Sequence, residues 1–415
     1  MKRTLQPARV TLVTLAALLG LTMLLGGCAA PAHTSTPAPG AAAGDSDAGS
    51  GDSGEQARFC ADAGDPLAAL ELLETPRTAS GRSTACLAND AVRVIDNRTP
   101  PALPATVVDA EERDVTVRSV ERILALDVSG TIAATVFGLG LGPNVIGRDA
   151  ATGFEGTQQL PLVTGAGHTL AVEAILALEP TVILTDTTIG PKEVRQQLRD
   201  AGIAVVMISS ERRLETAGSL VAEVATALGV PARGEALAAR MHDEIEAAKL
   251  EVAHIAPAAA SDRVRVAFLY ARGAANVYYL FGADSGADSL IDALGAVDVA
   301  SEIGWRGMQP MTAEALVAAQ PDALIMMTDG LASAGGVEGL LARIPALAQT
   351  PAGQHGRVID MADDAIFGFG PRSADVVRAL AKALYAAPSA DAGAGAGAGS
   401  DAGAGAAGSP AQGLG

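Results

Sequence analysis

Aromatic side chains are scarce in this 415-residue chain: they make up 3% of it, as one Trp, four Tyr and seven Phe. Positive charge is also in short supply, because 29 Lys and Arg stand against 47 Asp and Glu, for a formal net charge of -18. A polyanion would be repelled, and no basic stripe offsets the acidic balance, so nucleic acid is not expected as a partner. Any aromatic residue at a strand end or in a loop therefore stands out.

Familiar catalytic motifs are missing as well. The chain has no GxSxG elbow, no HExxH pair and no P-loop, and its first predicted strand continues into LDVSGTIAA instead of a Rossmann glycine fingerprint. These absences argue against an enzyme, although a missing motif does not by itself exclude catalysis.

The first of only three cysteines marks an export signal. An apolar run from Val10 to Leu25 follows the cations Lys2, Arg3 and Arg9, and two glycines then precede Cys28. A positive region, a short apolar region and a small-residue cleavage site form a secretory signal, here over residues 1–27. A cysteine after Gly-Gly predicts lipidation at Cys28 and a lipid anchor on the outer face of the cell membrane. An uncleaved membrane anchor is the alternative, but the run is short of the roughly 20 residues that a span needs.

The other two cysteines, Cys60 and Cys86, predict a disulfide. They lie about 26 residues apart in a chain expected to be exported, where thiols are oxidised. Metal binding by this pair is not expected, because no His or third Cys lies near enough in sequence to complete a site.

Composition divides the rest of the chain. Residues 28–58 and 387–415 are rich in Ala, Gly, Ser, Pro and Asp, which cannot bury apolar area, so a disordered tether and a disordered tail are expected. Residues 59–120 form a loop-rich lead-in that ends in TVVDAEERDVTVRS, a pattern typical of a β-hairpin.

From residue 121 the pattern becomes alternating strands and helices, which predicts an α/β fold with parallel sheets. An N-terminal lobe is expected over 121–232 and a C-terminal lobe over 257–386, both Rossmann-like. A long helix over 233–256 would bridge them, with the ligand in the cleft between the lobes. The phrases LAVEAILALEPTVILTD and MTAEALVAAQPDALIMMTD share the order Glu, apolar helix, Pro, apolar strand, Thr-Asp, which suggests duplicated architecture.

The chain combines a lipobox, a tether, two α/β lobes and one bridging helix. In this combination it resembles the helical-backbone class of ABC-transporter substrate-binding proteins, which carry haem, siderophores or cobalamin. The resemblance covers residues 104–385 and is strongest in EAILALEP and EALVAAQP. It implies that Glu173 and Glu314, one on each lobe, dock onto arginines of an ABC permease, which works with its ATPase. An exposed carboxylate can form a bidentate pair with Arg. The alternative is that each is an ordinary solvated residue at a helix start.

A sharper resemblance concerns the ligand. His168 stands in LVTGAGHTLAVEAIL, where open α/β sheets bind ligands. Tyr270 ends the strand RVRVAFLY, and Arg272 follows two residues later, on the same face if the extended run continues. These segments look like those of the HmuT-type haemin-binding lipoproteins. That resemblance implies that His168 and Tyr270 are the axial metal ligands of haem b, transported as ferric haemin.

The chemistry of these residue types agrees with the resemblance. Ferric iron suits a phenolate oxygen, and imidazole suits the opposite axial position. An unperturbed phenol is protonated near neutral pH, so a ligand tyrosine benefits from a guanidinium such as that of Arg272. Taken without the resemblance, a lone His before a helix is more often structural, and a strand-terminal Tyr is usually at the core rim.

Other candidates are weaker. Arg148 and Arg372 are each a possible haem-propionate partner or a structural ion-pair partner. Of the adjacent Tyr278 and Tyr279 at most one faces the ligand, and Tyr279 is the candidate. Trp305, Met308 and Met311 either contact a porphyrin face or pack their own loop. The remaining histidines, His33, His242, His254 and His355, are expected in solvated positions.

The expected function is therefore capture of ferric haemin outside the cytoplasm and its delivery to an ABC importer for haem and iron uptake, without enzymatic activity. A binding protein for ferric siderophore or cobalamin on the same scaffold is the alternative. An exported haem-dependent enzyme is a more distant one, because His and Tyr ligation would leave the iron no open position for a substrate.

Overall fold

A computed structural model of the chain describes residues 60, 63–96, 98–165 and 168–387. The predicted signal, Cys28, the tether with His33, and all of the tail beyond residue 387 lie outside these residues. Within the described part, no helix is both long and apolar enough to cross a membrane.

The N-terminal lobe is built on a four-stranded parallel sheet in the order β5-β4-β6-β7. Side chains alternate between its two faces, so Ile123 and Ala125 pack in one apolar cluster and Leu124 and Leu126 in another. The strands are β4 (Ile123–Leu126), β5 (Val145–Gly147), β6 (Val182–Thr185) and β7 (Ala204–Met207). The helices are α2 (Thr131–Gly138), α3 (Val172–Ala177), α4 (Lys192–Asp200) and α5 (Ala217–Ala227). The predicted hairpin is present as β2 (Ala105–Val108) and β3 (Asp114–Val117).

The C-terminal lobe has a seven-stranded sheet in the order β1-β13-β12-β8-β9-β11, with β10 also paired to β8. The sequence predicted a parallel sheet. The sheet of this lobe is mixed instead, because β9 is antiparallel to both β8 and β11. The strands are β1 (Arg82–Ala85), β8 (Arg265–Arg272), β9 (Val277–Phe281), β10 (Val297–Asp298), β11 (Met308–Pro310), β12 (Ala323–Met327) and β13 (Val358–Met361). The helices are α7 (Ala287–Ala293), α8 (Val299–Glu302), α9 (Ala313–Ala319), α10 (Thr328–Ser333), α11 (Gly336–Arg343), α12 (Pro351–His355), α13 (Asp363–Ile366) and α14 (Ser373–Tyr385).

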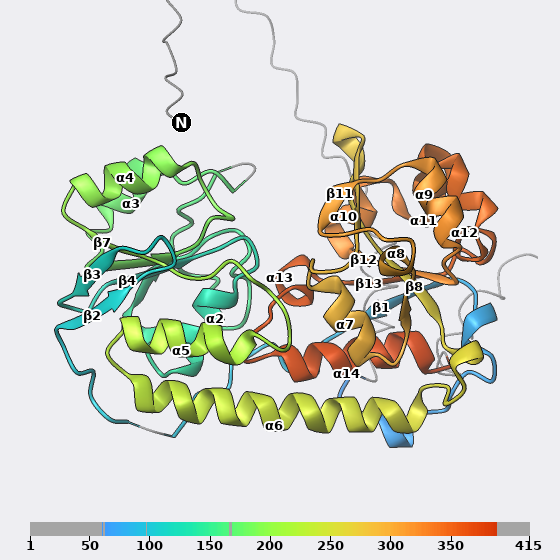
Figure 1. Cartoon of the computed structure of the whole chain (residues 1–415), viewed down its shortest axis with the longest axis horizontal. Coiled ribbons are helices and arrows are strands. Elements are labelled where there is room, and N and C mark those ends of the chain that lie inside the picture. The colour runs from blue at the N-terminus through green and yellow to red at the C-terminus, as the bar shows by residue number, and fades with distance from the viewer. Residues whose placement is uncertain (1–59, 61–62, 97, 166–167, 388–415) are drawn as a thin grey trace, which may run out of the picture. The chain divides into compact units, whose positions relative to one another are not determined.

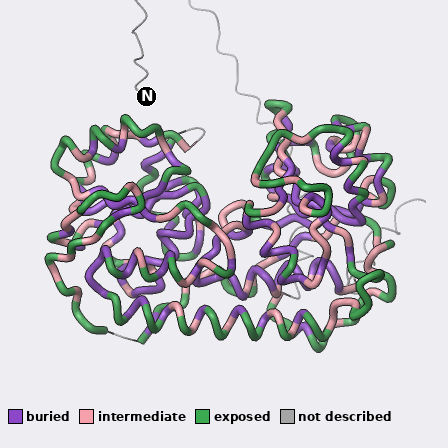
Figure 2. Tube along the Cα trace, in the orientation of Figure 1, coloured by how far each residue is buried: buried purple, intermediate pink, exposed green. Residues whose placement is uncertain are grey.

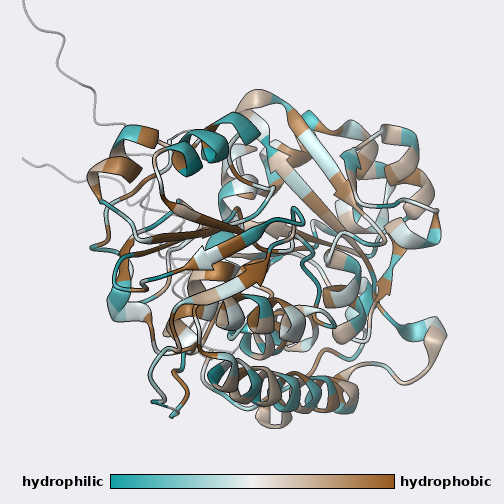
Figure 3. Ribbon diagram, turned by 60° about the vertical axis from the view of Figure 1, so that its left-hand side comes forward, coloured by the Kyte–Doolittle hydropathy of each residue, from teal (hydrophilic) through white to brown (hydrophobic). Residues whose placement is uncertain are grey.

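Helix α6 (Pro231–Ile255) is the bridging helix, and its bounds differ by one or two residues from the predicted 233–256. It packs on α5 of the N-terminal lobe and on α14 of the C-terminal lobe, so it runs beneath both (Figure 1). Buried residues concentrate along the strands of both lobes, whereas the outer side of α6 is exposed (Figure 2). The hydropathy colours agree, because the central strands are brown and the helices are mixed (Figure 3).

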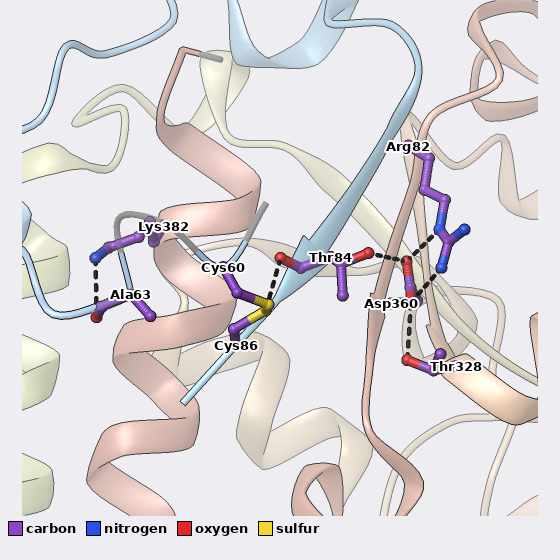
Figure 4. Close-up of a disulfide and its surroundings, with 8 residues drawn as sticks. All are labelled: Cys60, Ala63, Arg82, Thr84, Cys86, Thr328, Asp360 and Lys382. Carbon is purple, nitrogen blue, oxygen red and sulfur yellow. Dashed lines mark hydrogen bonds and ion pairs between the residues drawn. A yellow bond between two sulfur atoms is a disulfide. The ribbon is translucent and has the colours of Figure 1, made fainter. Parts of the chain in front are cut away.

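The lead-in is part of the C-terminal lobe, which the sequence did not predict. Strand β1 pairs in parallel with β13, so residues 82–85 form the edge of a sheet whose other strands lie beyond residue 264. The fully buried carboxylate of Asp360 accepts hydrogen bonds from Arg82 at 2.8 and 3.0 Å and from Thr84 at 3.1 Å. A disulfide joins Cys60 to Cys86 directly after β1 (Figure 4).

Residues 86–96 and 98–104, here called the strap, then cross from β1 to the hairpin of the N-terminal lobe. On the way Arg93 forms an ion pair with Glu244 of α6 at 2.9 Å, and the Ile95 amide donates to the Gly138 carbonyl of α2 at 3.0 Å. Arg233 at the start of α6 donates to the Thr99 carbonyl at 2.9 Å. The lobes are thus linked by two crossings of the chain, the strap and α6, and not by the helix alone.

Candidate functional site

Tyr270 and Arg272 lie on the last residues of β8, which extends two residues beyond its predicted end. Their side chains share a face, because residues two apart on a strand point the same way. The Arg272 Nε donates a hydrogen bond to the Tyr270 hydroxyl, and the guanidinium carbon lies 5.8 Å from the centre of the phenol ring. Tyr270 is half-buried and Arg272 is exposed. The positive charge of Arg272 therefore lies beside the phenol oxygen at the carboxyl end of β8.

Strand β9 decides which of the two adjacent tyrosines joins this face. Tyr279 is the register partner of Tyr270, with ring centres 6.2 Å apart. Tyr278 pairs instead with Ala271 and packs on the opposite face of the sheet. The candidate of the pair is therefore Tyr279, in agreement with the alternation of side chains along a strand.

His168 comes from the N-terminal lobe, in the loop between β5 and α3. Its backbone is left-handed, with φ of 59°, which is uncommon for a residue with a Cβ atom. Its Nδ1 is buried and has no hydrogen-bond partner in the part of the chain that the structure describes. Burial, and secondly the positive charge of Arg272, lower the pKa of His168 below its ordinary value of 6.5. The neutral imidazole, which is the form that binds metal, is thereby favoured.

The effect of Arg272 on His168 acts between the two lobes. Arg272 extends from the C-terminal lobe, yet it is close enough to the His168 ring to influence its pKa. The histidine and the tyrosine–arginine pair, 102 residues apart in the chain, therefore belong to one neighbourhood. A ring nitrogen without a partner and a phenol supported by a guanidinium are both groups that can bind a metal-containing ligand.

The two propionate candidates lie differently. Arg148 is half-buried and donates to the carbonyls of Asp149 and Thr152, both at 3.3 Å, while its Nε has no partner among the described residues. Arg372 is only 3% exposed and forms an ion pair with Asp90 of the strap at 2.6 Å. These contacts favour the structural alternative for Arg372.

Trp305 and the two loop methionines are divided between packing and exposure. Trp305 donates from its indole nitrogen to the Leu280 carbonyl at 3.0 Å and, with Met311, packs against the sheet. Met308 is 55% exposed, on the same face of the sheet as its partner Phe281. Trp305 and Met311 therefore follow the loop-packing alternative, whereas Met308 is free to contact a ligand.

The two docking candidates occupy equivalent places. Glu173 lies in the first turn of α3 and Glu314 in the first turn of α9, and both are exposed. Neither forms an ion pair with another described residue, so both carboxylates are available to an external cation. Their position in the first turn also complements the helix dipole.

Sequence reasoning missed a buried carboxylate cluster at the carboxyl edge of the N-terminal sheet. Asp127, Asp149 and Asp186 follow three strands and are fully buried. Arg212 pairs with Asp127 at 3.1 Å and with Asp186 at 2.6 Å. Burial and the nearby Asp127 raise the pKa of Asp149 to about 7. The sequence does show an Asp after each of the three strands. It does not show that Arg212 pairs with two of them, because no local pattern encodes such a partner.

Two cavities of the described residues lie away from this site. A groove of about 820 Å³ lies at the end of α6, lined in part by Leu72, Arg77 and His355, and a smaller one of about 300 Å³ lies between α5 and α6. Neither is lined by His168 or Tyr270. Among the described residues, no group of three or more His, Cys, Asp or Glu side chains is arranged to hold a bare metal ion.

Two α/β lobes joined by a long helix, with chemically distinct groups contributed by each lobe, define a two-lobed ligand-binding protein. The chain matches the model of the periplasmic binding protein family over residues 128–365, and it belongs to this family.

Solved structures narrow the comparison. The chain is similar to the crystal structure of the heme binding protein HmuT, with 40% identity, a TM-score of 0.70 and coverage of 75% of this chain and 99% of that one. It is also similar to the periplasmic heme-binding protein RhuT from Roseiflexus sp. RS-1 in apo form, with 36% identity, a TM-score of 0.58 and coverage of 64% and 97%. Other similar structures are HmuT variants in which a histidine, a tyrosine or an arginine is replaced by alanine. In HmuT this tyrosine lies two positions before this arginine.

A curated relative is the uncharacterized ABC transporter substrate-binding lipoprotein YvrC of Bacillus subtilis (strain 168). It is 25% identical over 287 residues, which cover 68% of this chain and 86% of the relative.

Proposed function

We propose that this protein captures ferric haem outside the cytoplasm and delivers it to an ABC importer. The observation that carries the proposal is that Arg272, which is hydrogen-bonded to Tyr270 on one lobe, acts electrostatically on His168 of the other. Similarity to HmuT and RhuT, which are heme-binding proteins, supports haem as the ligand. The tyrosine and arginine altered in the HmuT variants have the spacing of Tyr270 and Arg272, which supports the same use of these positions.

Each residue has a chemical role in this proposal. The Tyr270 oxygen binds ferric iron on one face of the porphyrin, and His168 binds it on the other. Arg272 donates to the phenol oxygen and stabilises its negative charge when iron is bound. Tyr279 lines the ligand beside Tyr270, and Arg148 is the remaining candidate for a propionate. Saturation of both axial positions suits a carrier, because no open position is left for catalysis.

The rival ligands are less well supported. In a siderophore- or cobalamin-binding protein, the unpaired ring nitrogen of His168 and the guanidinium-supported phenol of Tyr270 would have no special purpose. Membership of the periplasmic binding protein family supports a transport component and not an enzyme.

Haemin titration followed by absorption spectroscopy tests the proposal. The wild-type protein should develop a Soret band and an iron–phenolate charge-transfer band, and Tyr270→Phe should lose the second band and bind haemin at least about tenfold more weakly. His168→Ala should retain Tyr-anchored binding with an altered spectrum, and Arg272→Ala should weaken the Tyr bond. Tyr278→Phe is the matched control, because this half-buried tyrosine lies on the opposite face and its hydroxyl has no partner among the described residues. Wild-type spectra for both Tyr270→Phe and His168→Ala would refute the ligand assignment.

The lipid anchor is a further part of the proposal. Export is supported by the family and by the lipoprotein relative YvrC. Cys28→Ser should leave the protein unacylated and released from membranes, and continued membrane retention would contradict lipidation at Cys28.

Docking on the permease is assigned to Glu173 and Glu314. Glu173→Arg and Glu314→Arg should preserve haemin binding while lowering uptake into cells, because like charges would then meet at the permease. Glu235→Arg, which reverses an exposed charge on α6, is the control. Wild-type uptake with both docking residues replaced would refute this assignment.

A further inference from the structure

Half of the chain's scarce aromatic residues form one cluster that includes the proposed iron ligand Tyr270. Of twelve aromatic residues, six are linked by ring contacts between β8, β9 and the loop that follows α13. They are Phe268, Tyr270, Tyr279, Phe281, Phe367 and Phe369.

Three of these rings form a nearly parallel stack with Phe281 at its centre. The Tyr270 ring lies 6.4 Å from that of Phe281 at an interplanar angle of 21°, and the Phe367 ring lies 5.3 Å from Phe281 on a plane inclined by 25°. Phe268 supports the stack, at 5.1 Å from Phe281 and 4.7 Å from Phe367. Offset stacking of this kind has a preferred geometry, so the plane of one ring restrains the plane of the next.

Tyr270 is thus held in two independent ways. Arg272 restrains the phenol oxygen through a hydrogen bond, whereas the ring is contacted by Tyr279 and, in a nearly parallel plane, by Phe281. Tyr270 is half-buried near the end of β8, so these contacts act on a ring that the core does not fully enclose. A metal bond depends on both the position of the oxygen and the orientation of the ring.

Phe367 is the member of the stack whose place is not set by a strand. Phe268 is fully buried and Phe281 is 8% exposed, both in the sheet, whereas Phe367 is half-buried at the end of α13. Its carbonyl accepts a hydrogen bond from Thr131 of α2 at 3.5 Å. The loop that closes the stack is therefore in contact with the N-terminal lobe, which also supplies His168.

We propose that Phe367 is a positioning residue for ligand binding: it clamps Phe281 and, through it, orients the Tyr270 ring toward the bound iron. This inference rests on the proposed function. Phe367 need not touch the ligand, and its effect passes through the stack. If the ring only filled space in the core, its loss would lower stability without changing the bond between tyrosine and iron.

The test compares Phe367→Ala, Phe367→Leu and Phe367→Tyr with Phe137→Ala. Phe137 is a matched control, because it is also half-buried and makes one edge-to-face contact, with Phe154 at 5.0 Å, in the N-terminal lobe. Haemin affinity, the iron–phenolate charge-transfer band and unfolding by urea are measured for each variant. Phe367→Ala and Phe367→Leu should weaken haemin binding about two- to tenfold and shift or broaden the charge-transfer band. Phe367→Tyr should retain both properties, and Phe137→Ala should lower stability alone.

The outcomes separate this inference from the proposed function. If folded Phe367→Leu binds haemin with wild-type affinity and an unchanged charge-transfer band, the positioning role is wrong while haem binding stands. The same result for Phe367→Ala has the same meaning, and Phe367→Leu decides alone if the alanine variant does not fold. If the wild-type protein develops no charge-transfer band, or Tyr270→Phe keeps it, the proposed ligand set fails instead.

Discussion

Arg372 offers a direct test of whether a buried cation serves the ligand or the fold. Its side chain is only 4% exposed and reaches three partners from different parts of the chain. It pairs with Asp90 of the strap at 2.6 Å and donates to the Asp364 carbonyl at 2.6 Å. Its guanidinium carbon lies 5.1 Å from the ring centre of Phe154, in the N-terminal lobe. We predict that Arg372→Met destabilises the protein and leaves haemin affinity nearly unchanged.

The expected loss follows from these contacts. A hydrogen bond to a charged group contributes about 1.5–3 kcal/mol, and the carbonyl of Asp364 would lose its charged donor. The pair with Asp90 contributes less than a fully buried pair, because the Asp90 side chain is 45% exposed and water screens it. The contact with Phe154 adds about 1 kcal/mol. Methionine keeps much of the apolar stem, so the free energy of unfolding should fall by about 3 kcal/mol.

Urea unfolding by linear extrapolation measures this change, and haemin titration of the same samples measures affinity. Arg306→Met is the control, because Arg306 is 71% exposed and pairs with the exposed Asp284, so stability should change by less than about 0.5 kcal/mol. If Arg372→Met has unchanged stability and binds haemin about tenfold more weakly, the structural role is refuted. That result would instead support a contact between Arg372 and a haem propionate.

Three further predictions concern the rest of the fold. The pKa of Asp149 is raised from 3.8 to about 7, so between these pH values the folded state binds more protons than the unfolded state. The free energy of unfolding should therefore fall as pH rises through that window. Asp149→Asn should flatten the pH dependence of urea unfolding, by at most about 4 kcal/mol; an unchanged slope would contradict the shift. Replacing Cys60 and Cys86 by Ser should lower the free energy of unfolding by about 3 kcal/mol, as should reduction of the wild type, and equal stability would show that the disulfide contributes nothing. Because the strap and α6 both cross between the lobes, X-ray scattering with and without haemin should give nearly equal radii of gyration, and a change of several ångströms would refute this restraint.

The sequence by itself determined most of the regular elements. The strands β6 and β12 and the bridging helix α6 match predictions from continuous apolar runs and from a helical pattern, because such patterns arise locally from backbone geometry. The hairpin and the Tyr-x-Arg face follow from alternation in the same way. Helix α5 was not predicted, and neither were α8, α10, α12 and α13, which have six residues or fewer. Such short helices depend more on tertiary packing than on their own propensity.

Tertiary structure alone decided how distant segments combine. The pairing of Arg82 with Val358 in the edge of the sheet joins residues 276 apart, and no local pattern encodes such a partner. Burial likewise assigned Arg372 to the fold, because its sequence neighbours do not reveal Asp90 or Phe154. His168 was a candidate by its place in the sequence, but the burial of its unpaired nitrogen and the effect of Arg272 on its pKa arise only from tertiary packing. Residue type and local periodicity specify what a side chain can do, whereas long-range packing specifies which side chains act together.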